Sequence, residues 1–152
     1  MLLQEFLENS ALKFPRKTSL VYGNQRFTYE GLDSACNRLA QLLKKSGVRR
    51  GERVALYLEN CPESVISIFG ILKADAVFVI LNPQFKERKI GYIMEHCGAG
   101  AVISDTRLLS SAAGTLSKLP CLKTVVSTGG SVRPSLFPGK RVLSWDDLSE
   151  MP

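Results

Sequence analysis

Four short apolar runs recur along this chain at a nearly constant interval, and that rhythm limits the possible folds more than any other feature. The runs are RVALYL (53–58), AVFVIL (76–81), AVIS (101–104) and KTVVS (123–127). Each contains a valine, and the valines Val54, Val77, Val102 and Val125 are 23, 25 and 23 residues apart. Segments with helical apolar spacing separate the runs. Strands that alternate with helices at this interval predict β-α units in a parallel sheet, an α/β fold flanked by helices.

Smaller elements precede these units. Apolar residues at helical spacing over residues 2–14 predict an N-terminal helix. TSLVY and QRFT then flank Gly23-Asn24, a sequence typical of a two-residue β-hairpin turn. Thr28 can cap a following helix, whose apolar stripe runs through residues 32–43.

Length and composition agree with a single domain over residues 1–152. We divide it into a helix and hairpin (1–28), the β-α units (29–127), and a loop and tail (128–152). The net charge is +6, but the basic residues are scattered and not interleaved with aromatic residues, so we expect no nucleic-acid partner. No apolar run approaches the roughly 18 residues of a membrane span.

The four cysteines, Cys36, Cys61, Cys97 and Cys121, include no C-x-x-C pair. The single histidine, His96, is next to Cys97, and neighbours on a helix point apart, so this is a poor metal pair. We expect buried free thiols, no metal site and a cytoplasmic location.

The stretch STGGSVRPSLFPGK (127–140) suggests a phosphate-binding loop, but the comparison fails. In the pattern G-x-x-x-x-G-K-[ST], Gly139 and Lys140 fit, whereas Pro134 replaces a glycine and Arg141 replaces the hydroxyl residue. Pro134 and Pro138 also oppose the helix that would hold the anion. We expect a solvated surface loop.

Other polar and aromatic residues receive structural interpretations. Lys73 and Asp75 can pair in a site but fit a solvated helix end. Tyr29 and Tyr57 fit packing positions. His96 is a candidate general base, but no local arrangement of Ser, Cys or acid beyond Glu95 supports catalysis. Trp145 is expected to anchor the tail by burying its ring.

Several motifs give the chain a family resemblance. FTYEGL (27–32) is similar to a core motif L-T-Y-x-E-L, and LKADAVFVILNP (72–83) to L-K-A-G-A-x-x-x-P-L-N-P. Residues 47–55 match G-V-x-x-G-D-x-V-A, and residues 60–63 match N-x-P-E. The chain therefore resembles the amino-terminal part of the adenylate-forming (AMP-binding) ligases, in order and over roughly residues 1–150. Asn82-Pro83 favours acyl-CoA synthetases within this superfamily.

Three departures from the family pattern are informative. Gly31 stands where the family usually has glutamate, and Ile80 where it has proline. Asp75 replaces a glycine; if that residue takes a positive φ, aspartate is a tolerated but poorer substitute. These departures affect local geometry and not chemistry.

The resemblance implies an ATP-dependent acid–CoA ligase. A carboxylate attacks the α-phosphorus of ATP to give an acyl-adenylate and pyrophosphate, and the acyl group passes to coenzyme A. Such enzymes use ATP, Mg²⁺ and CoA, with a phosphate loop of the type S-S-G-T-T-G-x-P-K-G beyond a W-D-D-L-like segment. Here WDDL is residues 145–148 and no such loop is present.

We therefore expect an N-terminal fragment whose partner is the remainder of the ligase domain. No catalytic, cofactor-binding or metal residue carries over to residues 1–152, and the fragment itself is expected to be structural and inactive. Two alternatives stay open. One is a free-standing nucleotide- or CoA-binding domain, which would need a glycine-rich β-α turn. The other is a non-catalytic interaction module that binds a partner through an exposed face.

Overall fold

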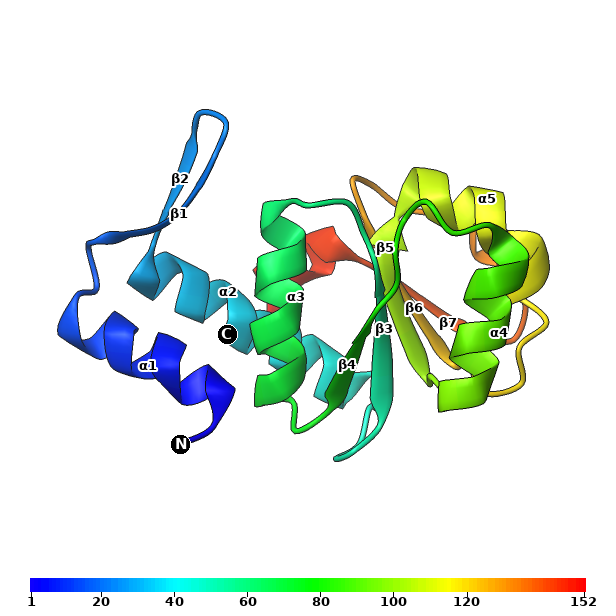
Figure 1. The fold of residues 1–152 in the computed structure, drawn as a ribbon, viewed down its shortest axis with the longest axis horizontal. Helices are drawn as coiled ribbons and strands as arrows, with labels where there is room; N and C mark the ends of the chain where they lie inside the picture. Colours follow the sequence, from blue (N-terminus) through cyan, green and yellow to red (C-terminus); the bar gives the residue numbers. More distant parts are fainter.

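A five-stranded parallel sheet forms the centre of the computed structural model, which describes residues 1–152 (Figure 1). The strand order is β4 (Val77–Ile80), β3 (Arg53–Tyr57), β5 (Ala101–Asp105), β6 (Thr124–Thr128) and β7 (Arg141–Ser144), and all neighbours are parallel. The first four strands confirm the predicted α/β fold. β7 lies in the segment expected to be loop and tail; four residues carry too little periodicity to reveal a strand.

Helices cover both faces of the sheet (Figure 1). α2 (Tyr29–Lys45) and α3 (Pro62–Lys73) pack on one face, and α4 (Glu87–Cys97) and α5 (Thr106–Leu116) on the other. β3 contributes alternate side chains to the two cores: Val54 and Leu56 to the first, Ala55 and Tyr57 to the second. A strand buried on both faces reads as a continuous apolar run, as β3 does.

The N-terminal elements form as predicted. α1 (Leu3–Lys13) packs against α2 and α3, and β1 (Thr18–Tyr22) pairs antiparallel with β2 (Gln25–Thr28). Figure 1 shows this hairpin extending away from the parallel sheet, on the side of α1 and α2.

Local signals in the sequence fix several element ends. Thr28 Oγ1 accepts a hydrogen bond of 3.1 Å from Gly31 N and caps α2, and Pro62 begins α3. Asp75 has φ of +62° and is the one non-glycine residue with positive φ. The glycine that the family carries here is therefore explained by the backbone, as expected.

The tail folds back onto α2 and β6. A short 3₁₀ helix at Trp145–Glu150 begins with a capping box, in which Ser144 N donates to Asp147 Oδ2 at 2.9 Å. Ser144 Oγ also accepts from Asp146 N at 3.2 Å, so Ser144 is the N-cap of this helix. The Trp145 ring is only half-buried, packed against the core beneath α2 and α3. No helix is both long and apolar enough to cross a membrane.

Candidate functional site

The strand order places a topological switch point at the carboxyl ends of β3 and β5. The connection that leaves β3 runs to β4 on one side, whereas the connection that leaves β5 runs to β6 on the other. Ligands of open α/β sheets bind in the crevice outside such a point. This edge is therefore the first place to look for chemistry.

Three charged residues meet at this switch point, and they are paired with one another. Arg107 Nη2 lies 4.0 Å from Glu59 Oε1 and 3.9 Å from Asp105 Oδ2. Asp105 Oδ1 also accepts a hydrogen bond of 2.7 Å from Leu108 N and so caps α5. Sequence reasoning missed Glu59 and Arg107, although each follows the end of a strand by two residues. Their positions after the strands could be predicted from the sequence. Their pairing could not, because it depends on the strand order.

Tyr57 lies beneath these charges and is a core residue, as expected. Its side chain is buried, and its hydroxyl donates to the Phe85 carbonyl oxygen at 3.2 Å. Burial raises the pKa of the Tyr57 phenol; the negative charge of Asp105 adds to this effect and Arg107 opposes it. The phenol therefore stays protonated near neutral pH and ties β3 to the loop before α4.

The glycine-containing loop after β6 lies at the surface, as expected, and most of its residues are exposed, but two of its apolar side chains are buried. Val132 and Phe137 are buried against the core beneath α4 and α5, and residues Pro134–Leu136 form a turn of 3₁₀ helix. Ser127 Oγ donates to Gly130 O at 2.7 Å and closes the first bend. Apolar contact at two positions thus holds a segment whose composition suggested exposure.

Lys140 is the lysine that fits the phosphate-loop pattern in residues 127–140, and its side chain forms hydrogen bonds with the backbone. Its ammonium donates to the carbonyl oxygens of Leu119 and Leu122 at 2.8 and 2.7 Å. Burial lowers the pKa of Lys140. The side chain joins this loop to the turn after α5 and is not directed at a phosphate.

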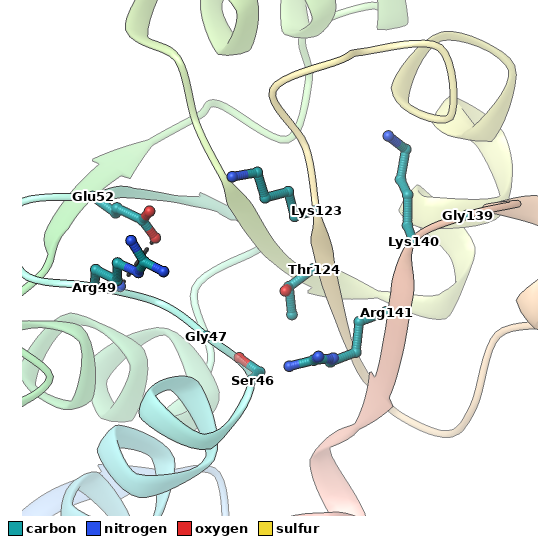
Figure 2. A pocket seen from close by; sticks show the side chains of 9 residues that line it. All are labelled: Ser46, Gly47, Arg49, Glu52, Lys123, Thr124, Gly139, Lys140 and Arg141. Carbon is teal, nitrogen blue, oxygen red and sulfur yellow. Dashed lines mark hydrogen bonds between the residues drawn. The ribbon is translucent and has the colours of Figure 1, made fainter.

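A polar hollow of about 610 Å³ opens at the opposite, amino edge of the sheet (Figure 2). Its lining residues are Ser46, Gly47, Arg49, Glu52, Lys123, Thr124, Gly139, Lys140 and Arg141. Figure 2 shows Arg141 extending toward Ser46; its Nη1 donates to Lys45 O at 3.4 Å. Two of the four cations in the hollow, Lys140 and Arg141, thus bind backbone carbonyls, and the hollow lies away from the switch point.

Lys73 is not at the solvated helix end that we expected. Its side chain is only 8% exposed, and Nζ lies 2.7 Å from Glu8 Oε1 and 2.9 Å from Asp33 Oδ1. Asp75 instead pairs with Lys44 at 3.5 Å on the surface. The expectation of a solvated helix end is therefore wrong for Lys73, because α1 brings the Glu8 carboxylate to it, and the alternative pair of Lys73 with Asp75 does not form.

The remaining singled-out residues do not meet in a site. His96 is exposed and stacks on Tyr92 with ring centroids 5.9 Å apart, and Tyr29 packs beside the core under α2. Of the four cysteines only Cys36 is buried; the other three are half-buried free thiols, which corrects the expectation of four buried ones.

These residues do not fit ATP or Mg²⁺. Arg107 at the switch point lies 3.9–4.0 Å from two carboxylates, and no group of three or more His, Cys, Asp or Glu side chains could hold a metal ion. A triphosphate needs free cations and backbone N–H groups directed at it. The absence of catalytic residues from this segment stays a prediction.

Comparison with known proteins identifies relatives of this chain. The family model of the AMP-binding enzymes matches residues 7–147. Tyrocidine synthase 3 of Brevibacillus parabrevis is 36% identical over 121 residues, which are 79% of this chain and 2% of that protein. A long-chain-fatty-acid–CoA ligase of Bacillus subtilis (strain 168) is 33% identical over 102 residues, which are 67% of this chain and 18% of the ligase.

Solved structures of ligases also resemble this chain. An anthranilate CoA ligase in complex with anthranoyl-AMP superposes with a TM-score of 0.88 at 29% identity, and the match covers 98% of this chain and 28% of that one. The chain thus spans less than a third of the length of these relatives.

Proposed function

Because the chain belongs to the family of AMP-binding enzymes, we propose that it is the N-terminal part of an ATP-dependent acid–CoA ligase. In that reaction a carboxylic acid and ATP give an acyl-adenylate and pyrophosphate, and the acyl group then passes to CoA. The superposition on the anthranilate CoA ligase carries this proposal, since the match covers nearly all of this chain and 28% of that ligase.

Within such an enzyme the role of this segment is architectural. At the switch point, Arg107 pairs with Glu59 and Asp105. The ammonium of Lys140 donates to two backbone carbonyl oxygens. The Lys140 contacts join the loop after β6 to the turn after α5, which supports a sheet against which a catalytic portion packs. ATP, Mg²⁺ and CoA would then be bound by residues outside this segment.

The choice of CoA as acceptor is part of the proposal. The curated relatives include peptide synthases and fatty-acid–CoA ligases at similar identity. Asn82-Pro83 follows β4 and favours a CoA ligase on the sequence pattern.

A chimera tests the proposal. Residues 1–152 replace the matching segment of the Bacillus subtilis ligase, and acid-dependent ATP–pyrophosphate exchange is measured. We expect the chimera to retain exchange within about tenfold of the parent, because remote packing changes of a few tenths of an ångström alter a barrier by roughly 1 kcal/mol. The isolated chain should show no exchange. Micromolar ATP binding by the isolated chain in calorimetry would instead support a free-standing nucleotide-binding domain.

One observation favours the second candidate, a non-catalytic interaction module. β4 is an edge strand of the sheet, and its Val77 and Ile80 are 46% and 63% exposed. Exposed apolar edges are typical of interfaces. A molecular mass that rises with concentration for the isolated chain, together with an inactive chimera, would favour this candidate over the ligase segment.

A further inference from the structure

Two half-buried thiols share one hydrogen-bond acceptor on the α4 side of the sheet. Cys97 Sγ lies 3.6 Å from the Met94 carbonyl oxygen, and Cys121 Sγ lies 3.7 Å from the same oxygen. Because both contacts are to one oxygen, the two sulfur atoms lie no more than about 7 Å apart, although 24 positions separate the residues in the sequence. Both are free thiols with partial access to solvent.

The backbone on each side lets these thiols approach further. Cys97 is the last residue of α4 and is followed by Gly98, which ends the helix in the left-handed conformation at φ +64°. Cys121 lies in the turn between α5 and β6, outside any regular element. A change of side-chain rotamer at the helix end and a small shift of the turn suffice to alter their separation.

Lys140 provides a positive charge beside the pair. Its ammonium is held by the carbonyl oxygens of Leu119 and Leu122, on either side of Cys121. Burial raises the pKa of the Cys121 thiol and a charge on Cys97 adds to this, whereas the Lys140 cation opposes the rise. The cation therefore offsets part of the cost of forming a thiolate here.

We propose that Cys97 and Cys121 form a dithiol site that a hydroperoxide oxidises to an intramolecular disulfide. One thiolate attacks the peroxide oxygen and displaces alkoxide or hydroxide, which leaves a sulfenic acid on that cysteine. The second thiolate attacks the sulfenic sulfur and releases hydroxide, which takes up a proton to form water. In balance, two thiols and one hydroperoxide give one disulfide, one alcohol and one water, so both sulfur atoms are oxidised and the peroxide is reduced.

The other two cysteines lack this arrangement. Cys36 is fully buried, and burial together with Asp33 raises its pKa to about 12. Cys61 Sγ lies 3.6 Å from Ser64 Oγ and shares no acceptor with another thiol. The site is independent of the proposed ligase role, since none of its members is assigned to the reaction.

Peptide mapping of the oxidised chain tests the site. The chain is treated with one equivalent of hydrogen peroxide or of an alkyl hydroperoxide, free thiols are blocked with N-ethylmaleimide, and the protein is digested with trypsin. We expect residues 90–107 to be linked to residues 119–123, with the loss of two hydrogen atoms. The linked pair should exceed any other cysteine pair by about tenfold, because proximity determines the resolving step.

Three variants complete the test. Cys61→Ser should preserve the cross-link, whereas Cys97→Ser and Cys121→Ser should abolish it and leave the remaining cysteine as a sulfenic or sulfinic acid. A wild-type chain in which both cysteines become separate sulfinic acids, or are cross-linked only between molecules, would overturn the proposal. The wild-type measurement decides the matter even if a serine variant fails to fold.

Discussion

Lys73 at the end of α3 and Glu8 on α1 form an ion pair of 2.7 Å across 65 positions of sequence. Asp33 on α2 lies 2.9 Å from the same ammonium, so one lysine joins three helices. The Lys73 side chain is almost fully buried, whereas Glu8 is about two-fifths exposed, at 42%. The network therefore attaches the N-terminal helix to the layer that α2 and α3 form.

Replacing Lys73 with methionine should destabilise the fold. The methionine keeps the apolar stem but leaves Asp33, whose side chain is 20% exposed, without its cation. Removal of one partner of a mostly buried pair leaves an uncompensated charge, so we expect a loss of about 1–3 kcal/mol in the free energy of unfolding. Urea titration measures this loss. Lys44→Met, which removes the exposed pair with Asp75, should change stability by less than about 0.5 kcal/mol; equal losses in both variants would contradict the network.

The same ion pairs predict a pH dependence in the alkaline range. Burial by itself lowers the pKa of Lys73, but the bonds to Glu8 and Asp33 outweigh it and raise the pKa above 10.5. A raised pKa means that the folded state holds the proton more tightly than the unfolded state does. The stabilisation is thus complete below pH 10.5 and is lost as the pH rises through the folded-state pKa. The stability difference between wild type and Lys73→Met should stay constant from pH 7 to 9 and shrink above pH 10.5. A difference that grows above pH 10.5 would show that the pKa of Lys73 is not raised in the folded state.

Gly70 permits close contact between α2 and α3. A Cβ atom at this position would lie 2.8 Å from Leu39 Cδ2 and 3.0 Å from Leu39 Cβ. Gly70→Ala should therefore lower stability by about 1–3 kcal/mol despite the better helix propensity of alanine. Gly114→Ala in α5 is the matched control, because nothing lies within 4 Å of its Cβ position. That variant should gain up to about 1 kcal/mol in thermal unfolding, and a gain at Gly70 would show that the helices have room to separate.

The sequence predicted the elements more completely than the contacts between them. Continuous apolar runs identify β3, β5 and β6 because burial on both faces demands such runs, whereas the run of β4 lies at an exposed edge of the sheet. Thr28 marks a helix start because its side chain accepts a backbone hydrogen bond. β7 and the buried Phe137 escaped because each depends on packing beside β6 and α5, which no local pattern encodes. The partner of Lys73 escaped for the same reason, since Glu8 is near only after α1 has folded back.

Asp75 offers a test of backbone strain. The residue is in the left-handed region at φ +62°, where a Cβ atom costs energy and glycine does not. We expect Asp75→Gly to stabilise the chain by up to about 1 kcal/mol, with the surface pair to Lys44 contributing little to the balance. Asp75→Ala should instead destabilise it by about 1 kcal/mol, because alanine keeps the Cβ and lacks the short polar side chain that tolerates this conformation. Chemical denaturation of both variants measures the two changes in the free energy of unfolding. Equal changes would mean that the positive φ of residue 75 does not determine the effect of substitution there.

Lys140 distinguishes a structural lysine from a phosphate-binding one. Its two hydrogen bonds hold the carbonyl oxygens of Leu119 and Leu122, so Lys140→Met should remove the lysine donor from both and lower stability by about 1–3 kcal/mol. Lys123→Met is the control in the same hollow: Lys123 is exposed, and its loss should change stability by less than about 0.5 kcal/mol. The two lysines carry the same charge at the same edge of the sheet, so an anion site would lose affinity for inorganic phosphate in both variants. We expect calorimetry to show no millimolar phosphate binding in wild type, Lys140→Met or Lys123→Met. In denaturation, we expect only Lys140→Met to lose stability. Phosphate binding that disappears in Lys140→Met without a loss of stability would restore the phosphate-loop interpretation of residues 127–140.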